Sequence, residues 1–183
     1  TELIVDGQYI MSPKDLKTID FLDKVVKAGV KVLKIEGRGR SADYVKVVTR
    51  CYKEAVQAIE DGTYSKEKIA DWDQRLATVF NRGFWDGYYL GRKMGEWTDR
   101  YGSQATETKV YIGKVTNYFN RIGVAEVRLE TANTMAVGDR YMVLGQTTGV
   151  YDDTLREIRL NKGPVPQAKQ GDAFSFETKV PLH

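Results

Sequence analysis

Four charged side chains lie within seven residues of one another and are the chain's strongest candidates for chemistry: Lys34, Glu36, Arg38 and Arg40. Lys34 and Glu36 are two residues apart, a spacing that places both side chains on one face of a β-strand. A paired cation and carboxylate can orient a substrate or move a proton, so we predict a catalytic role for both. The alternative is a structural ion pair that closes the end of the strand.

Gly37-Arg38-Gly39-Arg40 offers two guanidinium groups and backbone amides ahead of a helix N-terminus. Such a turn can bind a phosphate or a carboxylate, and we include Tyr44 in this predicted binding site. The turn lacks the full spacing of any nucleotide-binding fingerprint. A solvated turn whose arginines pair with nearby acids is therefore an open alternative.

A second candidate binding site begins at Asn81 and Arg82 and continues into an aromatic run: Phe84, Trp85, Tyr88 and Tyr89. Aromatic rings next to an arginine suit the stacking of unpaired RNA bases. The alternative is that these rings pack one domain against another.

Several site classes are excluded by the scarcity of two residue types. The only histidine is His183 and the only cysteine is Cys51. A Ser-His-Asp triad, a Cys-His pair, an ordinary zinc hydrolase site and an internal disulfide are therefore not credible for this chain alone. We predict that Cys51 is inert core packing on a helix, and that the chain holds no metal or cofactor.

The first forty residues predict one βαβα unit of a parallel sheet. After a first strand, Ser12 and Pro13 have the pattern of a helix start, with Asp15 in the first turn. Gly29 provides a C-terminal stop, and Val30–Ile35 is predicted as the second strand. Loops at the carboxyl ends of such strands usually carry the chemistry.

Helical spacing continues beyond that unit. Ser41 is predicted to cap a helix over residues 42–60, and Ser65 a second helix that continues through Phe80. Residues 84–97 are aromatic and glycine-rich. We predict that they form a compact, turn-rich connector rather than a helix.

From Lys109 the pattern changes to short strands separated by turns at residues 120–121, 137–139 and 170–172. This spacing predicts a small antiparallel β-barrel. The order G-K-V, V-G-D and a late G-D also resembles the second domain of translational GTPases such as elongation factor Tu. We place the domain boundary between residues 106 and 107, giving domains 1–106 and 107–183.

Several motifs resemble, in order, the carboxyl-terminal part of the collagenase-like U-32 peptidase family: SPKDL, FLDKVVKAGVKVLKIEGRGRSADYV, FNRGFWDGYYLG and YIGKV. Two departures stand out. Lys17 replaces a Cys that usually follows the SPKDL-like motif, and Gly39-Arg40 stands where the family reads KIEGRMKS. We predict an exposed Lys17. In iron–sulfur members the resemblance implies that the Cys is a cluster ligand, so its absence argues against a cluster.

The resemblance also implies a missing part, because the family's cysteine-containing signature lies in an amino-terminal region with no counterpart here. A βα barrel needs eight strands and typically about 250 residues. The predicted fold is therefore α/β plus all-β: a partial, incomplete TIM-barrel-like segment followed by a small β-barrel. We expect a fragment of a longer protein, or a free-standing truncated homologue, without peptidase or hydroxylase activity of its own.

The family implies two activities, collagenase-like peptidase and hydroxylation of RNA bases in tRNA or rRNA. We favour RNA hydroxylation, with this chain contributing RNA binding; a protease or a non-catalytic interaction module is the alternative. Expected partners are tRNA or rRNA, a polypeptide substrate, the missing amino-terminal barrel region and a second copy of the chain. The net charge of +3 gives no general nucleic-acid signal. No signal peptide or membrane span is found, so we expect a cytoplasmic protein.

Overall fold

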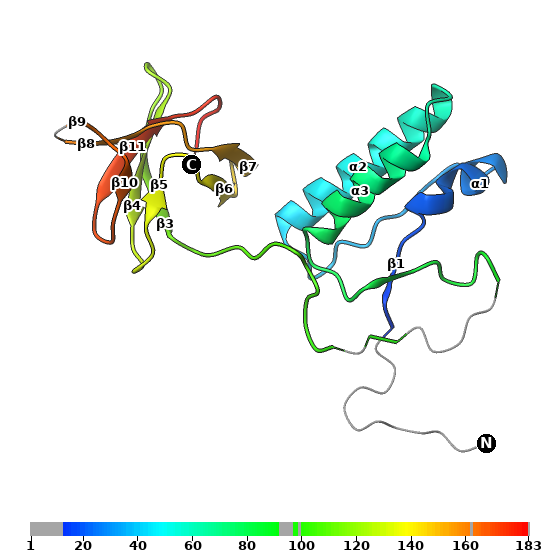
Figure 1. Ribbon diagram of the computed structural model, residues 1–183. Coiled ribbons are helices and arrows are strands. Elements are labelled where there is room, and N and C mark those ends of the chain that lie inside the picture. Colours follow the sequence, from blue (N-terminus) through cyan, green and yellow to red (C-terminus); the bar gives the residue numbers. More distant parts are fainter. Residues whose placement is uncertain (1–12, 92–96, 99, 162, 183) are drawn as a thin grey trace. The chain divides into compact units, whose positions relative to one another are not determined.

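Figure 1 shows the computed structural model of the chain, which describes residues 13–91, 97–98, 100–161 and 163–182. The chain divides into two compact units, Thr1–Thr108 and Lys109–His183. The described helices lie in the first unit, and antiparallel strands dominate the second. The chain is thus a mixed α/β protein with mostly antiparallel sheets.

Within its described residues, the first unit is built from three α-helices, one short 3-10 helix and two short strands: β1 (Asp15–Leu16), η1 (Ile19–Phe21), α1 (Leu22–Lys27), α2 (Ala42–Glu60), α3 (Lys66–Ala77) and β2 (Phe84–Trp85). β1 and β2 pair in parallel, with Asp15 opposite Phe84. The chain from α1 to α3 therefore connects two strands that lie side by side. This pairing brings the region around Asp15 next to the residues that follow α3.

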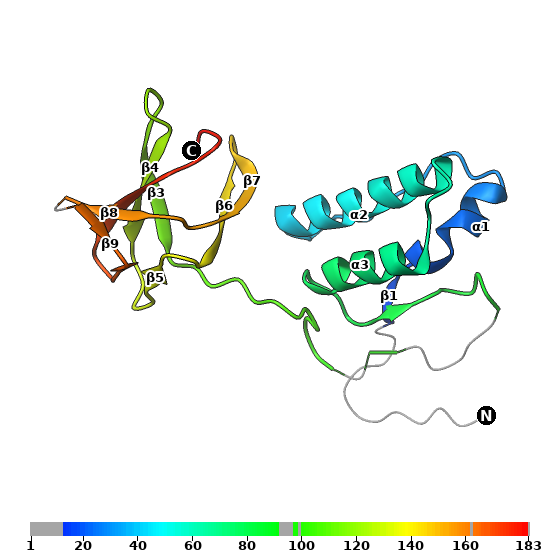
Figure 2. The same ribbon diagram turned by 45° about the horizontal axis from the view of Figure 1, so that its top comes forward.

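Helices α2 and α3 lie side by side in both ribbon views (Figures 1 and 2) and confirm the helical spacing. One face of α2 carries Val48, Cys51, Ala55 and Ala58, all buried, at intervals of three and four residues. These mostly small side chains pack in one core cluster with Trp72 and Leu76 of α3. The predicted ends also hold at Asp61, the C-cap of α2, and at Ser65, whose hydroxyl accepts a hydrogen bond from the Lys68 amide at 3.4 Å.

Two predictions for the first unit are wrong. No helix starts at Pro13: Asp15 lies in strand β1, and helical structure begins at Ile19. The predicted strand Val30–Ile35 is not formed, because no described strand pairs with it. Its Val32 side chain is 81% exposed as a result. The predicted cap Ser12 and the first strand lie outside the described residues.

Helix α3 ends at Ala77, before the predicted end at Phe80. The Thr78 hydroxyl donates to the Arg75 carbonyl at 2.7 Å, and the Asn81 side-chain amide donates to the Val79 carbonyl at 3.0 Å. These local bonds satisfy backbone carbonyls at the end of the helix. Residues 84–91 then form a short strand and turns, as predicted for the connector.

The second unit consists of nine described strands: β3 (Gly113–Phe119), β4 (Val124–Leu129), β5 (Met135–Ala136), β6 (Arg140–Gly145), β7 (Gly149–Thr154), β8 (Ile158–Leu160), β9 (Gly163–Val165), β10 (Gln167–Ala168) and β11 (Ala173–Glu177). Five of them form one sheet in the order β3-β4-β11-β8-β9, while β6 pairs with β7 and β10 with β5. The described strands thus form antiparallel sheets, as predicted, but no closed barrel, so the barrel itself is not confirmed. The ladder does not close because β6 and β7, among the described strands, hydrogen-bond only to each other.

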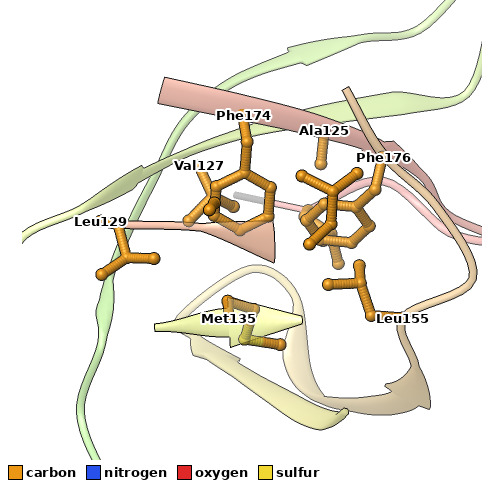
Figure 3. Packing of buried hydrophobic residues seen from close by; sticks show 10 residues of the cluster. Ala125, Val127, Leu129, Met135, Leu155, Phe174 and Phe176 are labelled. Atoms are coloured by element: carbon orange, nitrogen blue, oxygen red, sulfur yellow. The ribbon is translucent and has the colours of Figure 1, made fainter. Parts of the chain in front are cut away.

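The core of the second unit lies on the inner face of this sheet (Figure 3). Phe174 and Phe176 alternate with outward-facing residues on β11, and their rings stack 5.8 Å apart. Met135 of β5 and Leu155, which follows β7 directly, pack in the same cluster. The predicted turns at residues 120–121, 137–139 and 170–172 are confirmed.

No helix within the described ranges is long and apolar enough to cross a lipid bilayer.

Candidate functional site

The candidate site centres on the carboxylate of Asp15, which β1 places beside the end of α3. The Asp15 amide donates to the Gly83 carbonyl at 2.8 Å, which fixes the two segments against each other. Arg82 binds the carboxylate through both backbone and side chain: its amide donates to Oδ2 at 2.9 Å, and its Nη2 and Nε donate to Oδ1 at 2.8 and 3.2 Å. Arg82 is thus held in a single geometry.

A second arginine reaches the same oxygen from the turn before α2. Gly39 has φ of +69°, a left-handed conformation that favours glycine, and it lets the chain turn into Arg40. Nη2 of Arg40 lies 3.4 Å from Asp15 Oδ1. The guanidinium carbon also lies 4.0 Å from the centroid of the Phe80 ring and 5.5 Å from that of Tyr44. Arg40 is therefore stacked as well as ion-paired.

We call these three residues the Arg40–Asp15–Arg82 cluster. Its side chains are 22%, 19% and 33% exposed, respectively. Two guanidinium groups share one carboxylate, so the cluster carries one net positive charge. Each guanidinium has five N–H donors, and Asp15 uses only some of them. The cluster can therefore bind an anionic group such as a phosphate or a carboxylate.

A pocket of about 40 Å³ adjoins the cluster. It has room for a few water molecules but not for a nucleobase. Charged and aromatic side chains line it, among them Asp15, Lys17, Tyr44, Tyr52, Phe80 and Phe84. The Tyr52 hydroxyl accepts a hydrogen bond from the Thr18 amide at 2.9 Å, and burial raises the pKa of Tyr44. The Tyr44 phenol is therefore neutral at physiological pH.

Lys17 is not exposed as predicted: its side chain is only 14% exposed. Its Nζ lies 2.6 Å from a carboxylate oxygen of Asp73 and 3.0 Å from one of Asp20, and 5.4 Å from the centre of the Phe84 ring. Burial disfavours the charged form, but the two carboxylates outweigh it and raise the pKa of Lys17. The prediction failed because Lys17 precedes the first helix and points toward α3.

The two predicted catalytic residues lie apart from the cluster. Lys34 and Glu36 are 85% and 69% exposed, with 3.9 Å between Nζ and Oε2. The Glu36 carboxylate also accepts a hydrogen bond from the Arg38 amide at 2.7 Å, which shapes the turn. The Arg38 side chain is exposed. The structure thus brings together Arg40, Tyr44 and Arg82 of the predicted set, but not Lys34, Glu36 or Arg38.

Asn81 is 4% exposed and has a structural position. Its side-chain oxygen accepts a hydrogen bond from the Gly83 amide at 3.1 Å, and its side-chain nitrogen donates to the backbone carbonyls of Ala77 and Val79. In the adjoining aromatic run, Tyr88 and Tyr89 are 62% and 65% exposed. Trp85 packs edge-on against Tyr88, with ring centroids 5.2 Å apart.

Asp15, Lys17 and Phe80 belong to the site, although the sequence pattern does not predict them there. That pattern favours Asp15 as a first-turn acid of a helix that does not form. One sequence signal could have identified Asp15 and Lys17. They lie two residues apart, and residues two apart on a strand point to one face. Both in fact line the pocket.

Cys51 packs in the core of the first unit. Cys51 is fully buried, and burial raises the pKa of its thiol to about 11. No group of three or more His, Cys, Asp or Glu side chains that could hold a metal ion occurs among the described residues. Because burial raises its pKa, the Cys51 thiol is protonated at neutral pH.

Among solved structures, the chain is similar to the carboxyl-terminal domain of a Geobacillus thermoleovorans protein described as a U32 peptidase. The identity is 23%, the TM-score is 0.37, and the match covers 40% of this chain and 82% of that one.

Among curated proteins, a protein of Porphyromonas gingivalis named "Collagenase" is 54% identical over 97% of this chain and 43% of its own length. The Escherichia coli "tRNA hydroxylation protein P" is 28% identical over 96% of this chain and 37% of its own length. The Bacillus subtilis "tRNA hydroxylation protein P1" is 30% identical over 84% of this chain and 36% of its own. The chain spans less than half the length of these relatives.

The model of peptidase family U32 matches residues 2–99, which is more than half of the chain. That range includes the whole Arg40–Asp15–Arg82 cluster. The chain therefore belongs to peptidase family U32.

Proposed function

We propose that the chain is the substrate-binding carboxyl-terminal part of a U32 protein that hydroxylates a base of tRNA or rRNA. The observation that carries this proposal is the Arg40–Asp15–Arg82 cluster. Two arginines around one carboxylate leave a net positive charge and further N–H donors, which suit a phosphate of an RNA backbone. The relatives named tRNA hydroxylation proteins support the same substrate class.

Catalysis in this proposal needs groups beyond the described residues. Cys51 is buried and protonated, and the side chains of Lys34 and Glu36 are 85% and 69% exposed to solvent. The relatives are more than twice as long as their matched segment. We therefore propose that an amino-terminal barrel region supplies the remaining groups and that this part holds the RNA.

The test combines binding with product analysis. Fluorescence anisotropy with labelled, unmodified tRNA should show binding by the chain, and Arg40→Ala should weaken it about tenfold, because one charge-assisted contact contributes about 1.5 kcal/mol. Arg50→Ala, which removes an exposed cation of α2 outside the cluster, is the matched control. Nucleoside mass spectrometry should find no hydroxylated base after incubation with the chain alone. Absence of tRNA binding would contradict the proposal.

A second candidate is action on polypeptides. It is favoured by the 54% and 53% identity to the two Porphyromonas gingivalis proteins named "Collagenase", which exceeds the identity to the tRNA hydroxylation proteins. Incubation with gelatin tests it directly. Cleavage of gelatin by the chain, abolished in Lys34→Ala or Glu36→Ala, would favour this candidate over RNA hydroxylation.

A further inference from the structure

Two cations lie directly opposite each other on the five-stranded sheet of the second unit. Lys114 of β3 is paired with Arg128 of β4, and both side chains are exposed. They point to the outer face, because the next pair, Val115 and Val127, packs in the core. Like charges directly opposite on a sheet are destabilising. Packing of the fold gives no reason for this arrangement.

The carboxylates nearest along β4, those of Glu126 and Glu130, form no ion pair with these cations within the described residues. Glu126 Oε1 accepts a hydrogen bond from the Thr116 hydroxyl at 2.8 Å, and Glu130 Oε2 accepts one from the Tyr111 hydroxyl. Both acids are thus bonded to uncharged hydroxyl groups. Within the described part of the chain, no ion pair joins either acid to Lys114 or Arg128. The two cations are available to an anion from outside.

The backbone holds the two cations in register. A Cβ atom at Gly113 would lie 1.9 Å from the Arg128 carbonyl oxygen, so only glycine permits this close approach of β3 to β4. Directly opposite Cα atoms in antiparallel strands are about 4.5–5.5 Å apart. One phosphate can therefore contact Lys114 and Arg128 together and remove their repulsion.

The sheet face beside this pair is open. Ala173 of β11 lies opposite Arg128, and Ser175, two residues on, lies opposite Glu126 of β4 and Arg159 of β8. Both β11 residues have small side chains. Arg159 is exposed and pairs with Glu157, with Nε 3.0 Å from Oε1.

An exposed aromatic ring is tied to the residue that follows β4, two positions beyond Arg128. Tyr111 is 56% exposed, and its hydroxyl is held by Glu130, two residues beyond Arg128. A fixed, exposed ring beside a phosphate-binding pair is the arrangement that stacks an unpaired base.

We propose that the outer face of the five-stranded sheet binds unpaired RNA. Lys114 and Arg128 contact one backbone phosphate, and Tyr111 stacks on a neighbouring base. The identity of the polyanion as RNA rests on the proposed function, whereas the position of the site rests on the cation pair. This surface is separate from the Arg40–Asp15–Arg82 cluster, which belongs to the other unit.

The experiment measures the binding of a fluorescently labelled, unpaired RNA oligonucleotide to the full chain by anisotropy over a series of salt concentrations. Lys114→Ala with Arg128→Ala should weaken binding at least tenfold and lower the salt slope by about 0.7 for each phosphate that is no longer neutralised. Tyr111→Ala should weaken binding severalfold without changing the slope. The matched control, Arg156→Ala with Lys179→Ala, removes two exposed cations elsewhere on the same unit and should change affinity less than about twofold.

Lys114→Glu separates binding from folding. It replaces a repulsive cross-strand pair by an attractive one, so the thermal midpoint should rise while RNA affinity falls. Unchanged RNA affinity in the Lys114 and Arg128 double variant, with binding by the wild-type chain intact, overturns this inference alone. An equal weakening in the control double variant also overturns it, because the effect is then general charge. No RNA binding by the wild-type chain overturns this inference and the proposed function together.

Discussion

The two units differ in the secondary structure that builds their cores. The second unit has a continuous core beneath a five-stranded sheet, with Phe174 and Leu155 almost fully buried. In the first unit, α2 and α3 share a core, but the described strands are a two-residue pair, and Val32 and Leu16 are 81% and 53% exposed. A sheet of two short strands is marginal on its own. The core of the second unit thus lies on a sheet, whereas the core of the first lies between helices and leaves the apolar run around Val32 exposed.

The largest expected effect comes from breaking the core of the second unit. Phe174→Ala removes a ring that is 1% exposed and stacked on Phe176, so we predict a loss of about 3–5 kcal/mol in the free energy of unfolding. Chemical denaturation should show this loss in the strand signal. The helical signal of α2 and α3 should unfold at an unchanged denaturant concentration.

Leu144→Ala, at a residue of the same unit that is 50% exposed, is the control and should have a small effect. If Phe174→Ala shifts the helical transition equally, the units unfold as one and the comparison fails.

In the first unit the corresponding test removes the carboxylate at the centre of the cluster. Asp15→Ala leaves Arg40 and Arg82 without their common acceptor, and we predict a decrease of about 1.5–3 kcal/mol in the free energy of unfolding. Asp15→Asn keeps an acceptor oxygen and should destabilise less. The helical unfolding transition reports the change. A stability unchanged by Asp15→Ala would mean that the cluster does not hold β1 to the end of α3.

Local patterns predict α2, α3 and the turns of the second unit, whereas non-local contacts decide the remaining elements. The spacing of Val48, Cys51 and Ala55 specifies the buried face of α2, because helical periodicity is local. The apolar run Val30–Ile35 has strand composition, but a strand also needs a neighbour, and none of the described strands pairs with it. The pattern of a single sequence does not show whether such a neighbouring strand is present.

The candidate site shows the same limit. Local context predicts Arg40 and Arg82 each as binding residues, yet the sequence does not show that both contact Asp15. That contact depends on the parallel pairing of β1 with β2 across three helices. The sequence does not reveal that Lys17 is buried, because its partner Asp73 lies on α3, far along the chain. Local chemistry identifies the arginines, and tertiary pairing supplies their acceptor.

A smaller effect is expected from acid on the ion pair between α2 and α3. Arg75 Nη2 donates to Glu54 Oε1 at 2.9 Å, and this bond lowers the pKa of Glu54 below its ordinary value of 4.5. A depressed carboxyl pKa contributes stability above the unfolded-state pKa, and this contribution disappears as pH falls through the folded-state pKa. The helical unit should therefore lose stability below about pH 4.5. The loss should be smaller in the Glu54→Gln variant.

Glu54→Gln tests whether Glu54 causes this loss of stability, because glutamine does not titrate. A stability difference between wild type and Glu54→Gln that stays constant from pH 7 to pH 3 would contradict the assignment. The side chain of Glu54 is 40% exposed, so solvent screening keeps the expected difference small.

The smallest effect on stability, and the one that tests the comparison most directly, is expected at Val32. Its side chain is largely exposed, so Val32→Asp should change the free energy of unfolding by no more than about 0.5 kcal/mol. The same substitution should reduce self-association of the chain, because exposed apolar surface drives association. Ile122→Asp, at a 67% exposed turn residue of the second unit, is the matched comparison, and an equal reduction of association would mean that Val32 has no special role. Light scattering over a concentration series measures both variants. If the wild-type chain is monomeric at every concentration and binds no hydrophobic dye, the exposed apolar run around Val32 does not drive association.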